Sequence, residues 1–156
     1  ERERLVQNLQ ILLKSAHILD LPILWLEQYP QGLGPTIPEL AAILDGETPI
    51  SKTSFSACGE PNFMEALAQS GCKQAMVAGI ESHVCVYQTT RDLLAEDLEV
   101  EVIGDAVSSR TEANYKLGIQ RMANMGATIS SVEMCLFELL REAGSDVFKQ
   151  ISRLVR

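Results

Sequence analysis

A cysteine stands where a predicted strand passes into a predicted helix. The stretch VAGIESHVCVYQTT, residues 77–90, begins as an apolar run and places Cys85 within the first turn of the helix that follows. Unpaired backbone N–H groups and the helix dipole at such a start favour the thiolate over the thiol. Because the thiolate is the nucleophilic form, this position indicates covalent chemistry at Cys85.

Packing is the alternative explanation for this cysteine, because free cysteine is among the most commonly buried residue types. On position alone packing is favoured for Cys85, and both interpretations stay open at this point. For Cys58, Cys72 and Cys135, which lie in a loop, at a helix end and on a helix stripe, packing is favoured more strongly.

Strands and helices alternate along the rest of the chain. Apolar runs predict strands over 21–28, 73–80, 98–107 and 127–130, and periodic patterns predict helices over 2–19, 38–44, 61–70, 83–96, 111–125, 134–144 and 147–154. Ser109 with Glu112, and Ser130 with Glu133, have the spacing of capping boxes. The alternation predicts one domain over 1–156, a three-layer α/β/α fold with a mostly parallel, Rossmann-like sheet.

Ligands of such sheets bind beyond the carboxyl ends of the strands. Four segments qualify for this position: EQYPQGLGPT at 27–36, SKTSFSAC at 51–58, GIESHVC at 79–85 and GDAVSSR at 104–110. We therefore expect the chemistry of the protein in these segments. The third segment, which contains Cys85, is the most informative of them.

Composition and charge exclude several classes of protein. The 156 residues carry 13 Lys and Arg against 21 Asp and Glu, a formal net charge of −8 that disfavours binding to nucleic acid or to anionic membranes. We find no apolar run long enough to span a membrane and no apolar signal segment, and we expect a cytoplasmic protein. Neither the four cysteines nor His17 and His83 have metal-ligand spacing, so we expect no zinc site.

At this point the sequence resembles a family, the isochorismatase-like cysteine hydrolases, which include nicotinamidases and N-carbamoylsarcosine amidases. VAGIESHVCV, at 77–86, is similar to the family's nucleophile segment, and SKTSFSAC to the segment that supplies its catalytic lysine. EQYPQGLGPT looks like a subgroup described as isochorismatase domain-containing hydrolases. The resemblance covers nearly the whole chain in the right order, although it does not specify a substrate.

The resemblance implies a role for two side chains and one turn. Cys85 would be the nucleophile and Lys52 the cationic member of an Asp, Lys and Cys triad, whereas Lys52 alone would be interpreted as a solvated loop lysine. The family also has a non-proline cis peptide bond, which would fall between Ile80 and Glu81. That turn would direct the backbone N–H groups of Glu81 and Cys85 at an oxyanion.

Further residues follow from the same resemblance. The substrate would be contacted by Gln28, Tyr29, Phe55 and His83. Loop anchoring is equally plausible for the first three of these residues. For His83, a solvent-facing position at the helix start is favoured. The loop that holds metal ligands in some family members contains no histidine here, so we expect neither a metal nor another cofactor. The expected partners are a small-molecule substrate and further copies of the chain in a homo-oligomer.

The triad's aspartate is the one member without a counterpart in this sequence. In the family it ends a first strand upstream of the first long helix, and the sequence begins within that helix. We therefore expect a longer protein with an N-terminal strand ending in Asp, which would lie between the strands at 21–28 and 73–80. Asp105, Glu27 and Glu81 also stand at strand ends, with only a small expectation that one of them substitutes.

Two functional hypotheses follow. The first is a hydrolase that uses Cys85 and Lys52 to cleave an amide-like C–N bond in a small molecule through a covalent intermediate. The second is a catalytically silent binding or oligomeric scaffold protein of the same fold, which the missing acid favours somewhat. A nucleotide-binding domain is disfavoured, since no GxGxxG follows any predicted strand.

Overall fold

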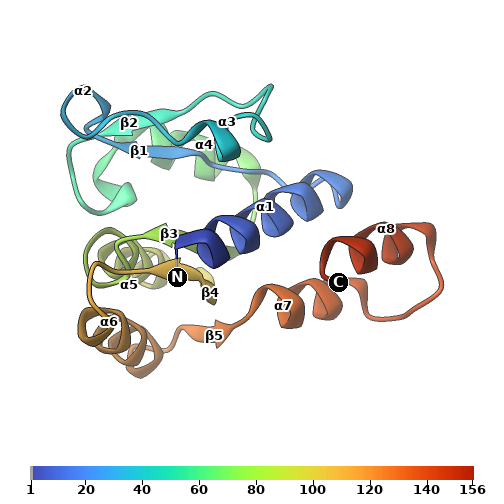
Figure 1. Ribbon diagram of the computed structural model, residues 1–156. Coiled ribbons are helices and arrows are strands. Elements are labelled where there is room, and N and C mark those ends of the chain that lie inside the picture. The colour runs from blue at the N-terminus through green and yellow to red at the C-terminus, as the bar shows by residue number, and fades with distance from the viewer. Residues whose placement is uncertain (1) are drawn as a thin grey trace.

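The computed structural model describes residues 2–156, and its helices and strands alternate along the chain (Figure 1). The strands are β1 (Leu26–Gln28), β2 (Ile50–Lys52), β3 (Gln74–Ile80), β4 (Glu99–Ser108) and β5 (Thr128–Ser130). The α-helices are α1 (Arg2–Ile18), α2 (Pro30–Leu33), α3 (Pro38–Ala41), α4 (Pro61–Ser70), α5 (Tyr87–Ala95), α6 (Glu112–Asn124), α7 (Val132–Leu140) and α8 (Asp146–Leu154). A 3₁₀ turn, η1 (Ala57–Gly59), and a π-helical turn, η2 (Ser82–Val86), complete the elements.

The strands form two parallel sheets. β1 pairs with β2, and β3, β4 and β5 pair in that order, with every pairing parallel. Within residues 2–156 no strand pairing joins the two sheets. The parallel arrangement predicted from the sequence is confirmed, and the further strand expected between β1 and β3 stays a prediction.

Helices cover both faces of the larger sheet, as the predicted three-layer fold requires. On one face α1 and α7 pack against β4, and α8 packs against these two helices, around a cluster that includes Leu12, Ile103 and Ile151. On the other face α5 and α6 pack against a cluster that includes Val102 and Met122. Figure 1 shows α1 and α8, from opposite ends of the chain, lying side by side. Burial on both faces explains why β4 reads as an apolar run.

The ends of two helices differ from the prediction. The N-cap of α6 is Thr111, whose hydroxyl accepts a hydrogen bond from Asn114 N at 3.2 Å, and not Ser109. The N-cap of α7 is Ser131, not Ser130, which belongs to β5. Spacing finds a capping signal, but neighbouring Ser and Thr residues compete for the position, and the backbone path selects one of them. The Ser109 hydroxyl is thereby available for other contacts.

The carboxyl ends of β1, β2 and β3 bring together three segments that are distant in sequence. Gln28 ends β1 and stands opposite Lys52, which ends β2, in the parallel pairing. Ile80 ends β3 and leads into η2, which contains Cys85. No helix in residues 2–156 has the length and apolar character needed to cross a membrane.

Candidate active site

Lys52 is a buried lysine with a full set of hydrogen-bond acceptors. Its side chain is 6% exposed, which rules out the solvated loop lysine considered from the sequence. The Nζ group donates to Gln28 Oε1, to the backbone carbonyl of Ser54 at 2.9 Å and to that of Phe55 at 2.8 Å. An ammonium group has three N–H donors, so these contacts satisfy all of them.

Gln28 connects this lysine to the cysteine. The Oε1 atom of Gln28, which accepts from Lys52 Nζ, lies 3.7 Å from Cys85 Sγ, and the thiol donates to it. Its Nε2 atom donates to the Thr53 carbonyl at 2.9 Å, which fixes the orientation of the amide. Gln28 is therefore placed beside Lys52 and Cys85, whereas the sequence indicated either a contact with substrate or loop anchoring.

Burial lowers the pKa of Lys52 from its usual 10.5, and the negative charge and hydrogen bonding of Cys85 act in the opposite direction. A buried ammonium group is disfavoured because it loses its hydration, while a neighbouring thiolate compensates part of that loss. Lys52 and Cys85 are thus close enough to influence each other electrostatically. A lysine with a lowered pKa can give up and regain a proton during a reaction.

The turn that carries Cys85 is not a simple helix start. The peptide bond between Ile80 and Glu81 is cis, and the chain then forms the π-helical turn η2 before α5 begins at Tyr87. The Glu81 carbonyl accepts hydrogen bonds from Val84 N at 3.1 Å and Val86 N at 3.2 Å. These bonds fix the backbone on both sides of Cys85, and π-turns of this kind are often found at functional sites.

The other residues expected to contact substrate lie around this cluster in different environments. Tyr29 and Phe55 are about half exposed, at 52% and 54%. Tyr29 follows Gln28 in the sequence, and the backbone carbonyl of Phe55 accepts a hydrogen bond from Lys52 Nζ. His83 lies between solvent and core, with its Nδ1 atom 2.9 Å from Ser109 Oγ. Its ring is thus engaged by the protein, and a substrate contact for any of the three stays a prediction.

The remaining cysteines differ from Cys85 in their surroundings. Burial raises the pKa of Cys135 to about 12, with further contributions from the charges of Glu101 and Asp105. Burial also raises the pKa of Cys58, and Cys72 is exposed. Cys85 is the cysteine whose thiol contacts the cluster of Gln28 and Lys52.

The acidic residues at the strand ends hold backbone rather than the cysteine. Asp105 Oδ1 accepts from Val132 N at 2.8 Å at the start of α7, and Glu27 Oε1 accepts from Thr36 N at 2.7 Å. Glu81 Oε2 accepts from Arg110 N at 2.8 Å. Each carboxylate is occupied as a structural acceptor. Within residues 2–156 no three His, Cys, Asp or Glu side chains are grouped as metal ligands would be.

Replacing Asp105 tests this structural role. We expect Asp105→Ala to lower the free energy of unfolding by about 1 kcal/mol, the usual cost of losing a capping acceptor. Asp105→Asn keeps an acceptor oxygen and should restore most of that loss. Urea unfolding measures both values, with Asp45→Ala as an exposed control expected to change stability by less than about 0.5 kcal/mol. A normal stability for Asp105→Ala would contradict the assignment.

Comparison with known proteins places this geometry in a family. Residues 1–134 match the isochorismatase domain. The chain belongs to the isochorismatase domain family. It is also 40% identical over 146 residues to isochorismatase domain-containing protein 2A of Mus musculus, covering 93% of this chain and 69% of that protein. The resemblance stated from the sequence is confirmed, and membership of an isochorismatase-like hydrolase family follows.

Several solved structures have the same fold. A structure described as the MAR1 ribonuclease of Caenorhabditis elegans matches with a TM-score of 0.91 and 36% identity, over 98% of this chain and 79% of that one. YcaC of Escherichia coli, described as an octameric hydrolase of unknown specificity, matches with a TM-score of 0.87 and 26% identity, over 91% and 71%. YcaC of Pseudomonas aeruginosa, solved with hexane-2,5-diol and covalent acrylamide, matches with a TM-score of 0.90 and 25% identity. The match covers 97% of this chain and 77% of that one.

Proposed function

We propose that this protein is a hydrolase in which Cys85 attacks an amide-like C–N bond of a small molecule and forms a covalent intermediate. The observation that carries the proposal is the contact of Gln28 Oε1 with both Lys52 Nζ and Cys85 Sγ. This contact brings a thiol and a buried lysine together at the carboxyl ends of parallel strands, where ligands bind in such sheets. A thiol beside a cationic group has the environment of an activated nucleophile.

The proposed reaction balances its protons through Lys52 and water. Lys52, in its ammonium form, stabilises the thiolate that forms when the Cys85 thiol gives its proton to water. The thiolate attacks the carbonyl carbon, and the backbone N–H groups of Glu81 and Cys85 stabilise the oxyanion. Lys52 then donates a proton to the leaving nitrogen as the C–N bond breaks, and it regains a proton from water. Water hydrolyses the resulting thioester, which releases the acid and restores the thiol.

The nature of the substrate is proposed from charge and from the resemblance to amidases. A net charge of −8 disfavours a polyanionic substrate, so a small molecule is favoured over an RNA, although the Caenorhabditis elegans relative is described as a ribonuclease. The structure of Pseudomonas aeruginosa YcaC contains covalent acrylamide, an amide that is also an electrophile toward thiolates. Such an adduct forms by addition to the C=C bond, so it supports a nucleophile in that relative, and the amide-like substrate is proposed from the resemblance to amidases.

A homo-oligomer is part of the proposal. The Escherichia coli relative is described as octameric, and this chain exposes Leu117 and Met134, at 53% and 63% of their surfaces, on α6 and α7. Burying large apolar side chains between subunits is favourable because it removes their surface from water. Light scattering on the purified protein would measure the mass of the assembly, and a monomer at all concentrations would contradict this part.

Alkylation with iodoacetamide at pH 6 tests the proposed nucleophile without knowledge of the substrate. We expect Cys85 to react first, because Lys52 favours its thiolate, and Cys135 to react last, because burial raises its pKa to about 12. Cys72 is the internal reference, since it is exposed and its thiol donates to the Ser70 carbonyl. Peptide mass spectrometry at several times measures each rate.

The same measurement separates the two functional hypotheses. A Cys85 that reacts no faster than Cys72 would reject the cysteine mechanism and favour the catalytically silent scaffold. A fast Cys85 together with turnover of any member of a panel of small amides would support the hydrolase.

A further inference from the structure

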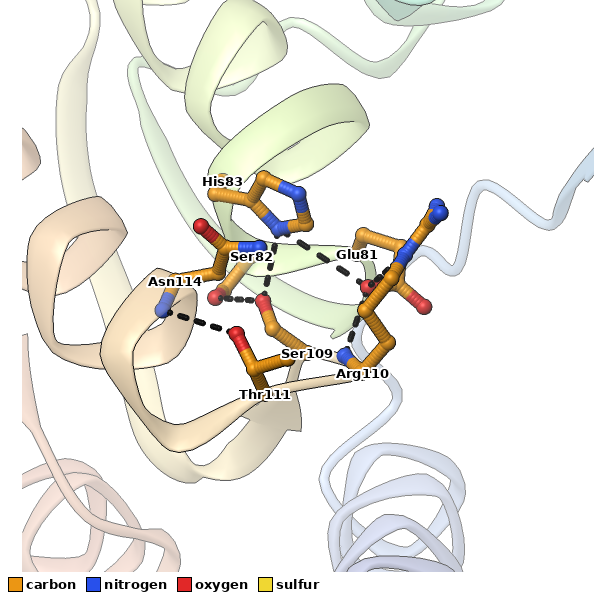
Figure 2. Close-up of polar contacts among 7 residues, drawn as sticks. All are labelled: Glu81, Ser82, His83, Ser109, Arg110, Thr111 and Asn114. Carbon is orange, nitrogen blue, oxygen red and sulfur yellow. Dashed lines mark hydrogen bonds and ion pairs between the residues drawn. The ribbon is translucent and has the colours of Figure 1, made fainter.

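The loop that follows β4 contacts the turn that carries Cys85 through one serine hydroxyl. Figure 2 shows Ser109 between Ser82 and His83, with dashed contacts to both. The Ser109 Oγ atom lies 2.5 Å from Ser82 Oγ and 2.9 Å from His83 Nδ1. Ser82 and His83 are the residues of η2 directly before Val84 and Cys85. A single side chain of another segment therefore holds the first half of this turn.

The chemistry of these groups gives the contacts a direction. His83 Nδ1 also lies 3.7 Å from Glu81 Oε2, and a carboxylate is only an acceptor, which favours a proton on Nδ1. The Ser109 hydroxyl then accepts from His83 and donates to Ser82 Oγ. Ser82 is fully buried, and buried hydroxyls need a partner, so Ser109 satisfies a group that water does not reach.

A second contact joins the same two segments beside the first. Glu81 Oε2 accepts from Arg110 N at 2.8 Å and lies 3.6 Å from Arg110 Nε, as Figure 2 also shows. Arg110, which follows Ser109, thus holds Glu81, which precedes Ser82. Together the two contacts bind the turn at Glu81, Ser82 and His83 to the loop between β4 and α6.

Helix α6 approaches the turn closely at a glycine. A Cβ atom built at Gly118 would lie 2.9 Å from the Ser82 carbonyl oxygen and 3.1 Å from His83 N. Both neighbours are backbone atoms, which cannot move aside as a flexible side chain can. The turn before Cys85 is therefore enclosed on this side by the Ser109 loop and by α6, with no room for a Cβ atom at Gly118.

We propose that Ser109 is a positioning residue for the Cys85 nucleophile. Its hydroxyl fixes Ser82 and His83, and the π-helical turn transmits that position to Cys85 two residues later. The proposal rests on the proposed function, because it assumes that Cys85 reacts. Small displacements of a nucleophile lower reaction rates strongly, so a loss of these contacts is expected to affect reactivity more than substrate binding.

The test compares Ser109→Ala with two matched variants of the full chain. We expect Ser109→Ala to slow iodoacetamide labelling of Cys85 by about 10-fold while Cys72 is labelled at its normal rate. Ser109→Thr keeps the hydroxyl and should restore labelling. Thr111→Ala is the control, because it removes the cap of α6 two residues away, and Figure 2 draws the polar contact of Thr111 to Asn114 rather than to Ser82 or His83. With an amide substrate, kcat should fall and KM should change little.

The outcomes distinguish a failure of the positioning role of Ser109 from a failure of the proposed cysteine mechanism. Slow labelling in Ser109→Ala, with normal labelling in Thr111→Ala and recovery in Ser109→Thr, supports the positioning role. Equal labelling in Ser109→Ala and the wild type, with Cys85 still faster than Cys72, overturns that role alone. Equal slowing in Thr111→Ala also overturns it, since the effect would then follow helix stability. A wild-type Cys85 no faster than Cys72 overturns both proposals.

Discussion

Replacing Cys85 by alanine is expected to lower kcat/KM on an amide substrate by roughly 10³-fold or more, the scale on which enzymes lose activity without their nucleophile. The covalent step needs the sulfur atom, and neither Gln28 nor Lys52 can form the thioester in its place. Turnover of the most active compound from an amide panel measures the effect. Mass spectrometry should at the same time show loss of any acyl adduct from the protein.

The matched control for this variant is Cys72→Ala, which removes an exposed thiol. We expect that change to leave kcat/KM unaltered. Cys85 is only partly buried, so Cys85→Ala should keep a folded protein, which thermal unfolding would verify. Substantial turnover by folded Cys85→Ala would exclude the covalent mechanism and would shift the assignment to a different nucleophile, such as an activated water.

Replacing Lys52 by methionine is expected to have the second largest effect, a loss of about 10²- to 10⁴-fold in kcat, the range usual for removal of an acid or base. Methionine has a similar length but neither stabilises the Cys85 thiolate nor donates a proton to the leaving nitrogen. Labelling of Cys85 at pH 6 should therefore slow in parallel with kcat. Parallel losses distinguish a role in activating the thiol from a role in binding substrate alone.

Lys73→Met, the same substitution at an exposed lysine, is the control for these rates and is expected to leave both unchanged. Labelling of Cys85 at the wild-type rate in Lys52→Met would show that the thiol is activated without this lysine. The proposed stabilisation of the thiolate by Lys52 would then be rejected, with Cys85 still the proposed nucleophile.

The same pair of variants has an expected dependence of stability on pH. Burial lowers the pKa of Lys52 in the folded protein below 10.5. In the pH interval between this lowered pKa and 10.5, the unfolded chain therefore binds more protons at this site than the folded chain. The stability of the wild type relative to Lys52→Met should therefore rise with pH across that interval. Below it the difference should be constant, and urea unfolding at several pH values measures it. For Lys73→Met no such trend is expected.

Local patterns in the sequence determined the fold class and the place of the proposed nucleophile. Apolar runs of strand length between amphipathic helices predicted a parallel sheet with helices on both faces, because a strand buried on both sides has no polar face to alternate. Pro61 and Gly71 predicted both ends of α4, since one presets helical backbone and the other accepts the left-handed conformation, with φ of 66°. Cys85 was singled out by its position, where a predicted strand passes into a predicted helix.

Short elements and cap positions required the tertiary structure. The three-residue strand β2 has too few residues for a periodic pattern, and its pairing with β1 is what stabilises it. The caps of α6 and α7 lie at Thr111 and Ser131, one or two residues from their predicted positions. Spacing alone cannot choose among adjacent hydroxyls, because the choice depends on where the chain arrives from the preceding strand.

The contacts of the site were likewise decided by the tertiary structure. Lys52 is buried, and Gln28 lies beside both Lys52 and Cys85. Ser109 contacts Ser82 and His83. The contacts of Gln28 and of Ser109 each join segments more than 20 residues apart. The sequence shows which residue types are present at strand ends, but it carries no local signal for which ends meet. That information arises only when the strands pair and the helices pack, since hydrogen bonds between distant segments depend on the assembled backbone.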